Sequence, residues 1–205
     1  MAEVVPQQAV GRRGLLLILM LLLIGGAEAQ IKYGLKAGLN FSTLSGASAT
    51  SSLLIGYHAG VFEDVKITDK FVFQPEVLFS SQGVNRKLDV IGIDEPDRAV
   101  KYQVKIYYLN VALMMKYYVI RKLDLEAGPQ IGLMLSAWNV MDGNKYALNS
   151  VQPIDWGANV GAGYDFTDHI SVGVRYYYGL LNISKYRHDE NVRNRVFGVS
   201  GMYRF

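Results

Sequence analysis

A chain of 205 residues can form one domain with a full-sized core, or one barrel. Half of the residues are hydrophobic, but 21 glycines, 14 tyrosines and the lack of cysteine suit neither a helical bundle nor a disulfide-stabilised scaffold, and they exclude thiol redox chemistry. The net charge of +3 is too small and too dispersed to indicate nucleic-acid binding, and the sequence contains no RNP, zinc-finger or helix-turn-helix motif.

The chain begins with a segment typical of a secretory signal peptide. A pair of arginines at 12–13 precedes an apolar run over 15–24, and a small-residue cleavage site ends at Ala29. A membrane anchor is the competing interpretation, but the run is shorter than the roughly 20 apolar residues that a spanning helix needs. We therefore expect residues 1–29 to be a cleaved signal peptide and residues 30–205 to form the mature barrel.

The mature chain shows hydrophobic residues with a period of two, which is the period of a strand. In IKYGLKAGLNFS, LDLEAGPQIGLMLSA and DWGANVGAGYDF, every second residue is apolar and those between are mostly polar or glycine. Such alternation indicates a strand with one apolar and one polar face. The same template predicts eight strands, at 31–42, 53–65, 71–82, 104–119, 123–137, 154–166, 170–180 and 193–205.

The predicted connections alternate in length. The long ones cover 43–52, 83–103, 138–153 and 181–192. The short ones cover 66–70, 120–122 and 167–169. This rhythm is typical of an up-and-down barrel with long loops at one end and tight turns at the other. The sequence therefore predicts an all-β fold, a closed antiparallel up-and-down transmembrane β-barrel of eight strands.

Alternation alone does not say which face points inward, because a soluble lipocalin-like barrel buries its apolar face and an outer-membrane barrel turns that face to lipid. The polar face is rich in glycine, asparagine and serine, which suits a narrow filled interior. The apolar face carries aromatic residues near both strand ends, as expected for two girdles at the membrane interfaces. These are Tyr33, Phe41, Trp156, Phe166, Tyr176, Tyr178, Phe197 and Phe205. With the signal peptide, these features favour the outer membrane.

The last five residues, GMYRF, continue the alternation to the end of the chain. Tyr203 and Phe205 fall on the lipid face and Arg204 on the interior face. A barrel has no free edge only if its last strand pairs with its first, so we expect the chain to end inside the sheet. A terminal aromatic residue resembles the carboxy-terminal signal by which outer-membrane barrels are recognised for insertion. We expect Tyr203 and Phe205 to form this assembly signal.

A wider resemblance covers nearly all of the mature chain. The segments that carry it are, in order, GLKAGLNFSTLSG, FQPEVLFSSQG, YLNVALMMKYY, LEAGPQIGLMLSA, GANVGAGYDF, VRYYYGLLNI and NRVFGVSGMYRF. Together they resemble the PorT-like outer-membrane β-barrel family of Gram-negative bacteria. The resemblance implies an integral outer-membrane barrel. One founding member of that family is associated with protein secretion, and most members have no assigned activity.

Charged residues on the predicted interior face are Lys36, Glu76, Lys116, Glu126 and Arg175. Lys116 lies opposite Glu126 if the tight turn centres on Arg121. Paired charges in a water-poor lumen could form a proton relay or a catalytic dyad. We favour a structural network that plugs the lumen, because an eight-stranded barrel is just wide enough to be filled by its side chains.

Some outer-membrane barrels are lipid hydrolases or acyltransferases, which need serine, histidine and an acid within hydrogen-bond reach. His58 points into the lumen by register, His169 lies in a tight turn and His188 lies in the last long loop. We find no matching serine and carboxylate on the face of any of them, and their spacing does not suit a metal cluster. We expect no enzymatic activity, metal or cofactor. A lipid-modifying enzyme and a narrow small-solute channel remain alternatives.

The charge-rich segment SKYRHDENVRNR precedes the last predicted strand. Its simplest interpretation is a solvated loop. The alternative is that Lys185, Arg187, Arg193 and Arg195 contact lipopolysaccharide phosphates in the outer leaflet.

The expected protein is a monomer with both termini in the periplasm and its long loops outside. Its expected role is structural, surface-interacting or secretion-associated. The expected partners are outer-membrane lipid and lipopolysaccharide, the barrel-assembly machinery during biogenesis, and a secretion-system or surface partner, with no nucleic acid among them.

Overall fold

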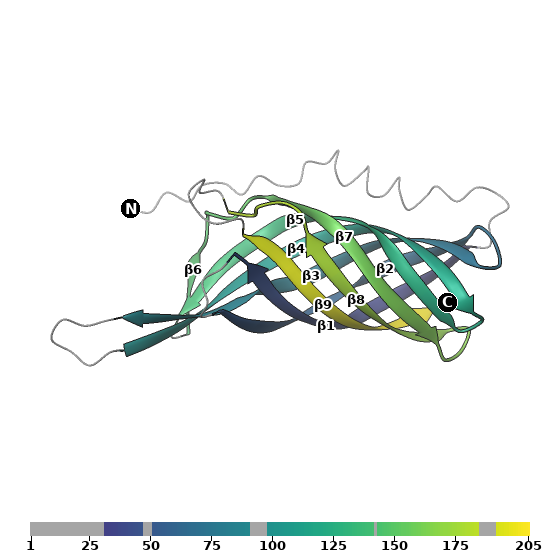
Figure 1. Cartoon of the computed structure of the whole chain (residues 1–205), viewed down its shortest axis with the longest axis horizontal. Helices are drawn as coiled ribbons and strands as arrows, with labels where there is room; N and C mark the ends of the chain where they lie inside the picture. The colour runs from purple at the N-terminus through teal and green to yellow at the C-terminus, as the bar shows by residue number, and fades with distance from the viewer. Residues whose placement is uncertain (1–30, 47–50, 91–97, 142, 185–191) are drawn as a thin grey trace.

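The computed structural model describes residues 31–46, 51–90, 98–141, 143–184 and 192–205 (Figure 1). The predicted signal peptide lies outside these residues. Among the described residues, no helix is long and apolar enough to cross a membrane. The strands are β1 Ile31–Ser45, β2 Ser51–Lys66, β3 Phe71–Val90, β4 Arg98–Ile120, β5 Leu123–Met141, β6 Asn144–Ala147, β7 Ile154–Asp165, β8 Ile170–Gly179 and β9 Arg193–Arg204.

Eight of these strands form one closed antiparallel ring. Neighbours are paired in the order β4, β3, β2, β1, β9, β8, β7 and β5, and a pairing between β4 and β5 closes the ring. The first and last strands pair from Gly34 opposite Arg204 to Ser45 opposite Arg193. The predicted eight-stranded barrel is confirmed, and the chain does end inside the sheet. Every strand edge of the ring is therefore hydrogen-bonded, as a hydrocarbon environment requires.

The barrel has two different ends. Tight turns join β2 to β3, β4 to β5 and β7 to β8 at one end, which we call the turn end, and the C-terminus lies there (Figure 1). The longer connections lie at the opposite end, which we call the loop end. The predicted alternation of short and long connections is confirmed.

Two predictions about the loop end are corrected. β3 and β4 extend past the predicted 71–82 and 104–119, and their hairpin projects beyond the rest of the barrel (Figure 1). The predicted connection 138–153 contains β6, which pairs with the last residues of β5. Outside the apolar belt neither strand face has to be hydrophobic, so period-two alternation fades there while the backbone ladder continues.

The apolar face of the barrel points outward. Along β9, Ser200, Met202 and Arg204 are buried, whereas Val199 and Tyr203 are exposed. The same alternation places polar side chains inside and an apolar, partly aromatic belt outside on the other strands. This is the arrangement of a barrel that faces lipid and the reverse of a soluble lipocalin-like barrel.

An apolar cluster seals the lumen at the loop end. Its buried members come from the ends of several strands and from two connections: Leu44, Val84, Val104, Ile106, Tyr108, Ala137, Val151 and Ile183. Val151 forms a β-bridge with Ser184, and the Gln152 N–H donates to the Ile183 carbonyl at 2.8 Å. These two connections therefore fold across the mouth of the barrel and close it.

We predict that the cost of a charge on the outer face depends on depth. Val160 lies near the middle of β7 and Leu53 near the loop end of β2, and both are 57% exposed. Val160→Arg should lower the free energy of unfolding in lipid by roughly 2–4 kcal/mol, and Leu53→Arg by roughly 0–1 kcal/mol. Denaturant titration of both variants in lipid vesicles measures this. Equal, small losses would show that this face does not lie in the hydrocarbon core.

Candidate functional site

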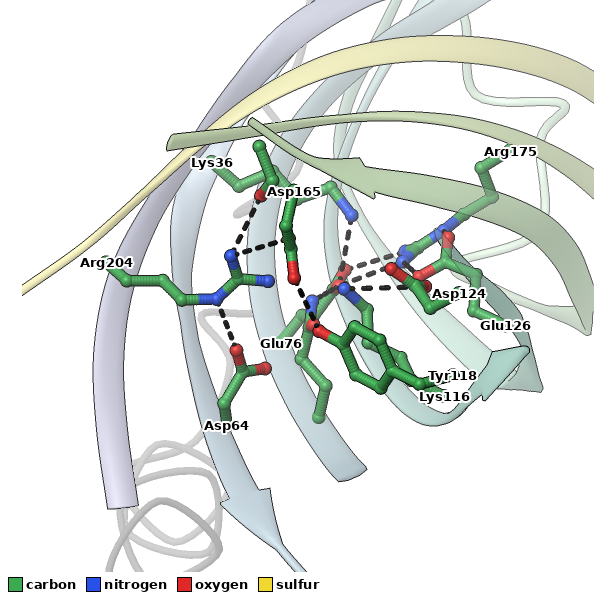
Figure 2. Close-up of polar contacts among 12 residues, drawn as sticks. Lys36, Asp64, Glu76, Lys116, Tyr118, Asp124, Glu126, Asp165, Arg175 and Arg204 are labelled. Carbon is green, nitrogen blue, oxygen red and sulfur yellow. Dashed lines mark hydrogen bonds and ion pairs between the residues drawn. The ribbon is translucent and has the colours of Figure 1, made fainter. Parts of the chain in front are cut away.

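The centre of the lumen holds a cluster of four charged side chains from four strands, which we call the central cluster (Figure 2). Glu76 accepts a hydrogen bond from the Lys36 ammonium group at 3.0 Å. Arg175 donates to both Glu76 oxygens at 2.7 and 2.9 Å. The same guanidinium donates to both Glu126 oxygens, also at 2.7 and 2.9 Å.

The central cluster neutralises itself because it contains two cations and two carboxylates. Glu76 and Lys36 are almost fully buried, and Gln74 adds a further hydrogen bond to Glu76. A buried charge is tolerated when it is paired and hydrogen-bonded, and bidentate arginine–carboxylate pairs are the strongest of such contacts. The cluster therefore fills the lumen with satisfied charge.

Lys116 takes a different partner from the other four predicted residues. It pairs in register with Glu126, as the sequence predicts from the turn at Arg121. Arg175 already occupies both Glu126 oxygens, however, and the nearest carboxylate to the Lys116 ammonium group is that of Asp124, at 3.7 Å. Lys116 and Asp124 are both fully buried, and neither the ammonium group nor the carboxylate has a hydrogen-bond partner in the structure.

Glycines on β7 make room for these carboxylates. Gly161 lies opposite Glu126 and Gly163 opposite Asp124 on the neighbouring strand. A Cβ at Gly161 would lie 2.8 Å from Glu126 Oε1, and one at Gly163 would lie 2.5 Å from Asp124 Oδ2, both closer than real contacts allow. The alternating glycines of GANVGAGYDF thus leave space for large charged side chains from β5.

A second group, the turn-end cluster, surrounds Arg204 of the last strand (Figure 2). Arg204 Nε donates to Asp64 at 2.6 Å, and Nη1 donates to Asp165 at 2.9 Å and to Ser171 at 3.1 Å. The Tyr118 hydroxyl donates to the other Asp165 oxygen at 2.9 Å. The sequence analysis placed Arg204 inside but did not find this cluster, because its members come from strands that are distant in the chain.

His58 forms a hydrogen-bonded trio with Asn40 and Ser200. His58 Nδ1 lies 2.8 Å from Asn40 Oδ1, and Nε2 lies 2.8 Å from the Ser200 hydroxyl. The Asn40 amide nitrogen donates to Ser80 and to the Ser81 carbonyl, so Oδ1 faces the imidazole. Nδ1 then carries the proton, and Nε2 accepts from Ser200.

The prediction that His58 has no matching serine is therefore wrong, although the third member is an amide instead of a carboxylate. Gly38 of β1 pairs with His58 on one side and with Ser200 on the other. Because Gly38 has no side chain, the imidazole reaches across β1; a Cβ there would lie 2.8 Å from the ring. A sequence search that compares only neighbouring strands cannot find such a contact.

A small polar cavity of about 40 Å³ lies beside the trio, with Asn159, Tyr177 and Arg175 also in its lining. This volume holds about three water molecules, which is too little for an acyl chain. Among the described residues, no group of three histidine, aspartate or glutamate side chains could hold a metal ion.

The other predicted residues lie on the barrel surface. His169 is exposed in the turn before β8, and its Nδ1 contacts the Arg204 carbonyl at 2.9 Å. Arg195 faces outward at the loop end, 3.5 Å above the Tyr178 ring. Phe205 is exposed, and its N–H donates to the Tyr33 carbonyl at 2.9 Å. Lys185, Arg187 and His188 lie outside the described residues.

A closed ring of strands with an outward apolar belt and a self-neutralising polar interior defines an integral outer-membrane β-barrel. The family model for the outer membrane protein beta-barrel domain matches residues 26–185, and this chain belongs to that family.

Solved structures show the same fold. Neisserial surface protein A is 16% identical, with a TM-score of 0.54 over 84% of this chain and 97% of that one. The attachment invasion locus protein Ail of Yersinia pestis is 12% identical, with a TM-score of 0.47 over 85% and 98%. OprG of Pseudomonas aeruginosa is 14% identical, with a TM-score of 0.38 over 85% and 94%. No curated protein matches the sequence. The family and the fold indicate a location in the outer membrane.

We predict that neutralising Glu76 destabilises the barrel. Glu76→Gln leaves Lys36 without its carboxylate in the lumen, and removing one member of a buried ion pair typically costs about 3–5 kcal/mol. Glu126→Gln should cost less, because Arg175 keeps both contacts with Glu76. Denaturant titration in lipid vesicles measures both losses. The exposed variant Asp69→Asn is the control and should unfold like the wild type; a Glu76→Gln variant as stable as this control would contradict the prediction.

Proposed function

We propose that this protein is a non-enzymatic, monomeric outer-membrane barrel whose own side chains close its lumen, with a structural, surface-interaction or secretion-associated role. We further propose that it belongs with the PorT-like barrels of Gram-negative bacteria, with its turn end and both termini in the periplasm. The observation that carries the proposal is the closure of the lumen at two levels, by the central cluster and by the apolar cluster at the loop end.

The geometry of the central cluster supports closure, because its members span the barrel. In the ring of eight strands, β3 and β8 are four places apart, so the pair between Glu76 and Arg175 crosses the full width of the lumen. Lys36 on β1 and Glu126 on β5 are also four places apart. Four strands at regular intervals therefore meet in one ion-paired layer, which a dissolved solute would have to break in order to pass.

The proposal predicts no discrete channel openings when the wild-type protein is reconstituted in a planar bilayer. The double variant Glu76→Ala/Arg175→Ala should open more often than the wild type, because it removes the contact that crosses the lumen. Asp69→Asn, which alters an ion pair in an exposed turn, is the control and should stay closed. Regular wild-type openings of one conductance would instead support the small-solute channel.

The trio of Asn40, His58 and Ser200 is the observation that favours the alternative of a lipid-modifying enzyme. A serine that donates to histidine Nε2, with Nδ1–H oriented by an amide oxygen, resembles a nucleophile with its general base. The trio faces the inside of the barrel, however, beside a cavity with space for water only. We therefore assign it a packing role. Acyl-chain release from labelled lipid by the wild type and not by Ser200→Ala would overturn this assignment.

The proposed partners include the barrel-assembly machinery, which we propose reads Tyr203 and Phe205. The Phe205 ring packs edge-on against Tyr203 with centroids 5.6 Å apart, and it is 67% exposed. So exposed a ring contributes little to stability. A recognition role therefore predicts that Phe205→Ala leaves protease-sensitive precursor in the periplasm, while the purified variant still folds into detergent.

Phe197→Ala is the matched control. It removes a ring from the outer face of the same strand, at its far end, where the ring lies 6.3 Å from that of Phe41. Protease accessibility in cells and folding in detergent are measured for both variants. If both assemble equally well in cells, Phe205 is an ordinary member of the girdle and no recognition signal.

Outer-membrane lipid, lipopolysaccharide and a secretion-system or surface protein complete the proposed partners. Arg193 and Arg195 face outward at the loop end, where lipopolysaccharide phosphates would lie in the proposed orientation. Affinity capture of the tagged protein from native outer membrane would separate a barrel that acts alone from one that travels with a secretion machine.

A further inference from the structure

The lumen is closed at the loop end but hollow at the turn end. A cavity of about 710 Å³ lies there, bounded by the ends of the strands and by the tight turns. We call it the turn-end vestibule. Its volume lies within the range of about 300–1,000 Å³ that is typical of sites for drug-sized ligands.

Arg204 forms the polar floor of the vestibule and is 97% buried, since its exposed fraction is 3%. Asp64 and Asp165 hold two of its nitrogens, but Nη2 is buried and has no hydrogen-bond partner. An unsatisfied guanidinium donor in a buried position is costly. The floor therefore presents a fixed, unpaired donor to whatever occupies the vestibule.

The rim of the vestibule carries an excess of positive charge. Lys66 and Asp69 pair with each other at 2.8 Å, and the hydrogen bond and charge of Lys66 lower the pKa of Asp69, which keeps this pair ionised. Lys32, Lys70 and Arg121 have no ion-pair partner within the described part of the chain.

Against these three cations stands one carboxylate that has no ion-pair partner among the described residues, that of Asp168. The remaining vestibule carboxylates already neutralise Arg204 or Lys66. Val72 and Tyr118 add apolar surface to the wall. The vestibule thus combines a cationic rim, an apolar wall and a donor on its floor.

We propose that the turn-end vestibule binds an acidic peptide segment of a periplasmic partner, with carboxylates at Lys70 and Arg121 and the deepest one at Arg204 Nη2. A peptide fits better than a lipid headgroup, because the vestibule lies inside the ring of strands, whereas lipid lies outside it. The inference rests on the proposed function for one point only, namely that the turn end faces the periplasm.

The test uses the full mature chain in detergent and a fluorescent peptide of alternating glutamate and leucine. Fluorescence anisotropy should show saturable, salt-sensitive binding, and the glutamine–leucine peptide should not bind. Lys70→Gln/Arg121→Gln should weaken binding about fivefold, as expected for two partly solvated charge contacts. Both residues lie in exposed turns, so the variant is expected to fold.

Lys122→Gln is the matched control. It removes a cation from the same turn as Arg121, but Lys122 does not line the vestibule and its ammonium group donates to the Phe166 carbonyl at 3.3 Å. Binding that is equal in the wild type and the double variant, or equally weakened by Lys122→Gln, would overturn the proposal. Competition by vesicles of anionic lipid but not by excess unlabelled peptide would assign the site to a headgroup and also overturn it.

This experiment and the conductance experiment can fail separately, because peptide binding is read on purified protein and closure is read in a bilayer. Protease protection of the turn end in oriented vesicles tests the periplasmic orientation by itself.

Discussion

The guanidinium of Arg175, held between Glu76 and Glu126, is the contact on which the rest of the interior depends. A narrow barrel that turns its apolar face to lipid leaves only polar side chains for its lumen. Charges there are far from bulk water and need partners with good geometry. Arginine suits this position because its planar fork of donors serves two carboxylates at once, and these come from strands on different sides of the ring.

The small residues of the lumen follow from the large ones. Glu126 and Asp124 fit because Gly161 and Gly163 face them, and His58 reaches Ser200 because Gly38 lies between them. The lumen is thus packed by alternating bulky and absent side chains around the ring, as expected for a small barrel with a filled interior. On the outer face the constraint is different: Gly201 has nothing within 4 Å of an added Cβ.

The sequence predicted the features that local periodicity controls. Alternation gave the strands and their faces, and the tight turn at Arg121 gave the register of Lys116 with Glu126. Contacts between strands that are not neighbours depend on the tilt and stagger of the whole ring, which no single segment contains. That is why the partners of Arg204, and Ser200 as the partner of His58, were missed.

The loop end was predicted least well, for a different physical reason. Beyond the lipid belt the strands no longer need one apolar face, so the extensions of β3 and β4 and the short β6 leave little trace in the periodicity. Val151 and Ile183 lie in connections whose sequence reads as irregular. Their burial follows from folding over the barrel mouth, which is a tertiary effect.

The most direct test of the account is the coupling between Glu76 and Arg175 in a double-mutant cycle. The free energy of unfolding in lipid vesicles is measured for the wild type, Glu76→Gln, Arg175→Gln and the double variant. If this pair braces the barrel across its lumen, the double variant should be more stable than the sum of the single losses predicts, with a coupling energy of at least about 1 kcal/mol. Losses that add without coupling would show that the two residues stabilise the barrel independently, and would contradict a structure organised around their contact.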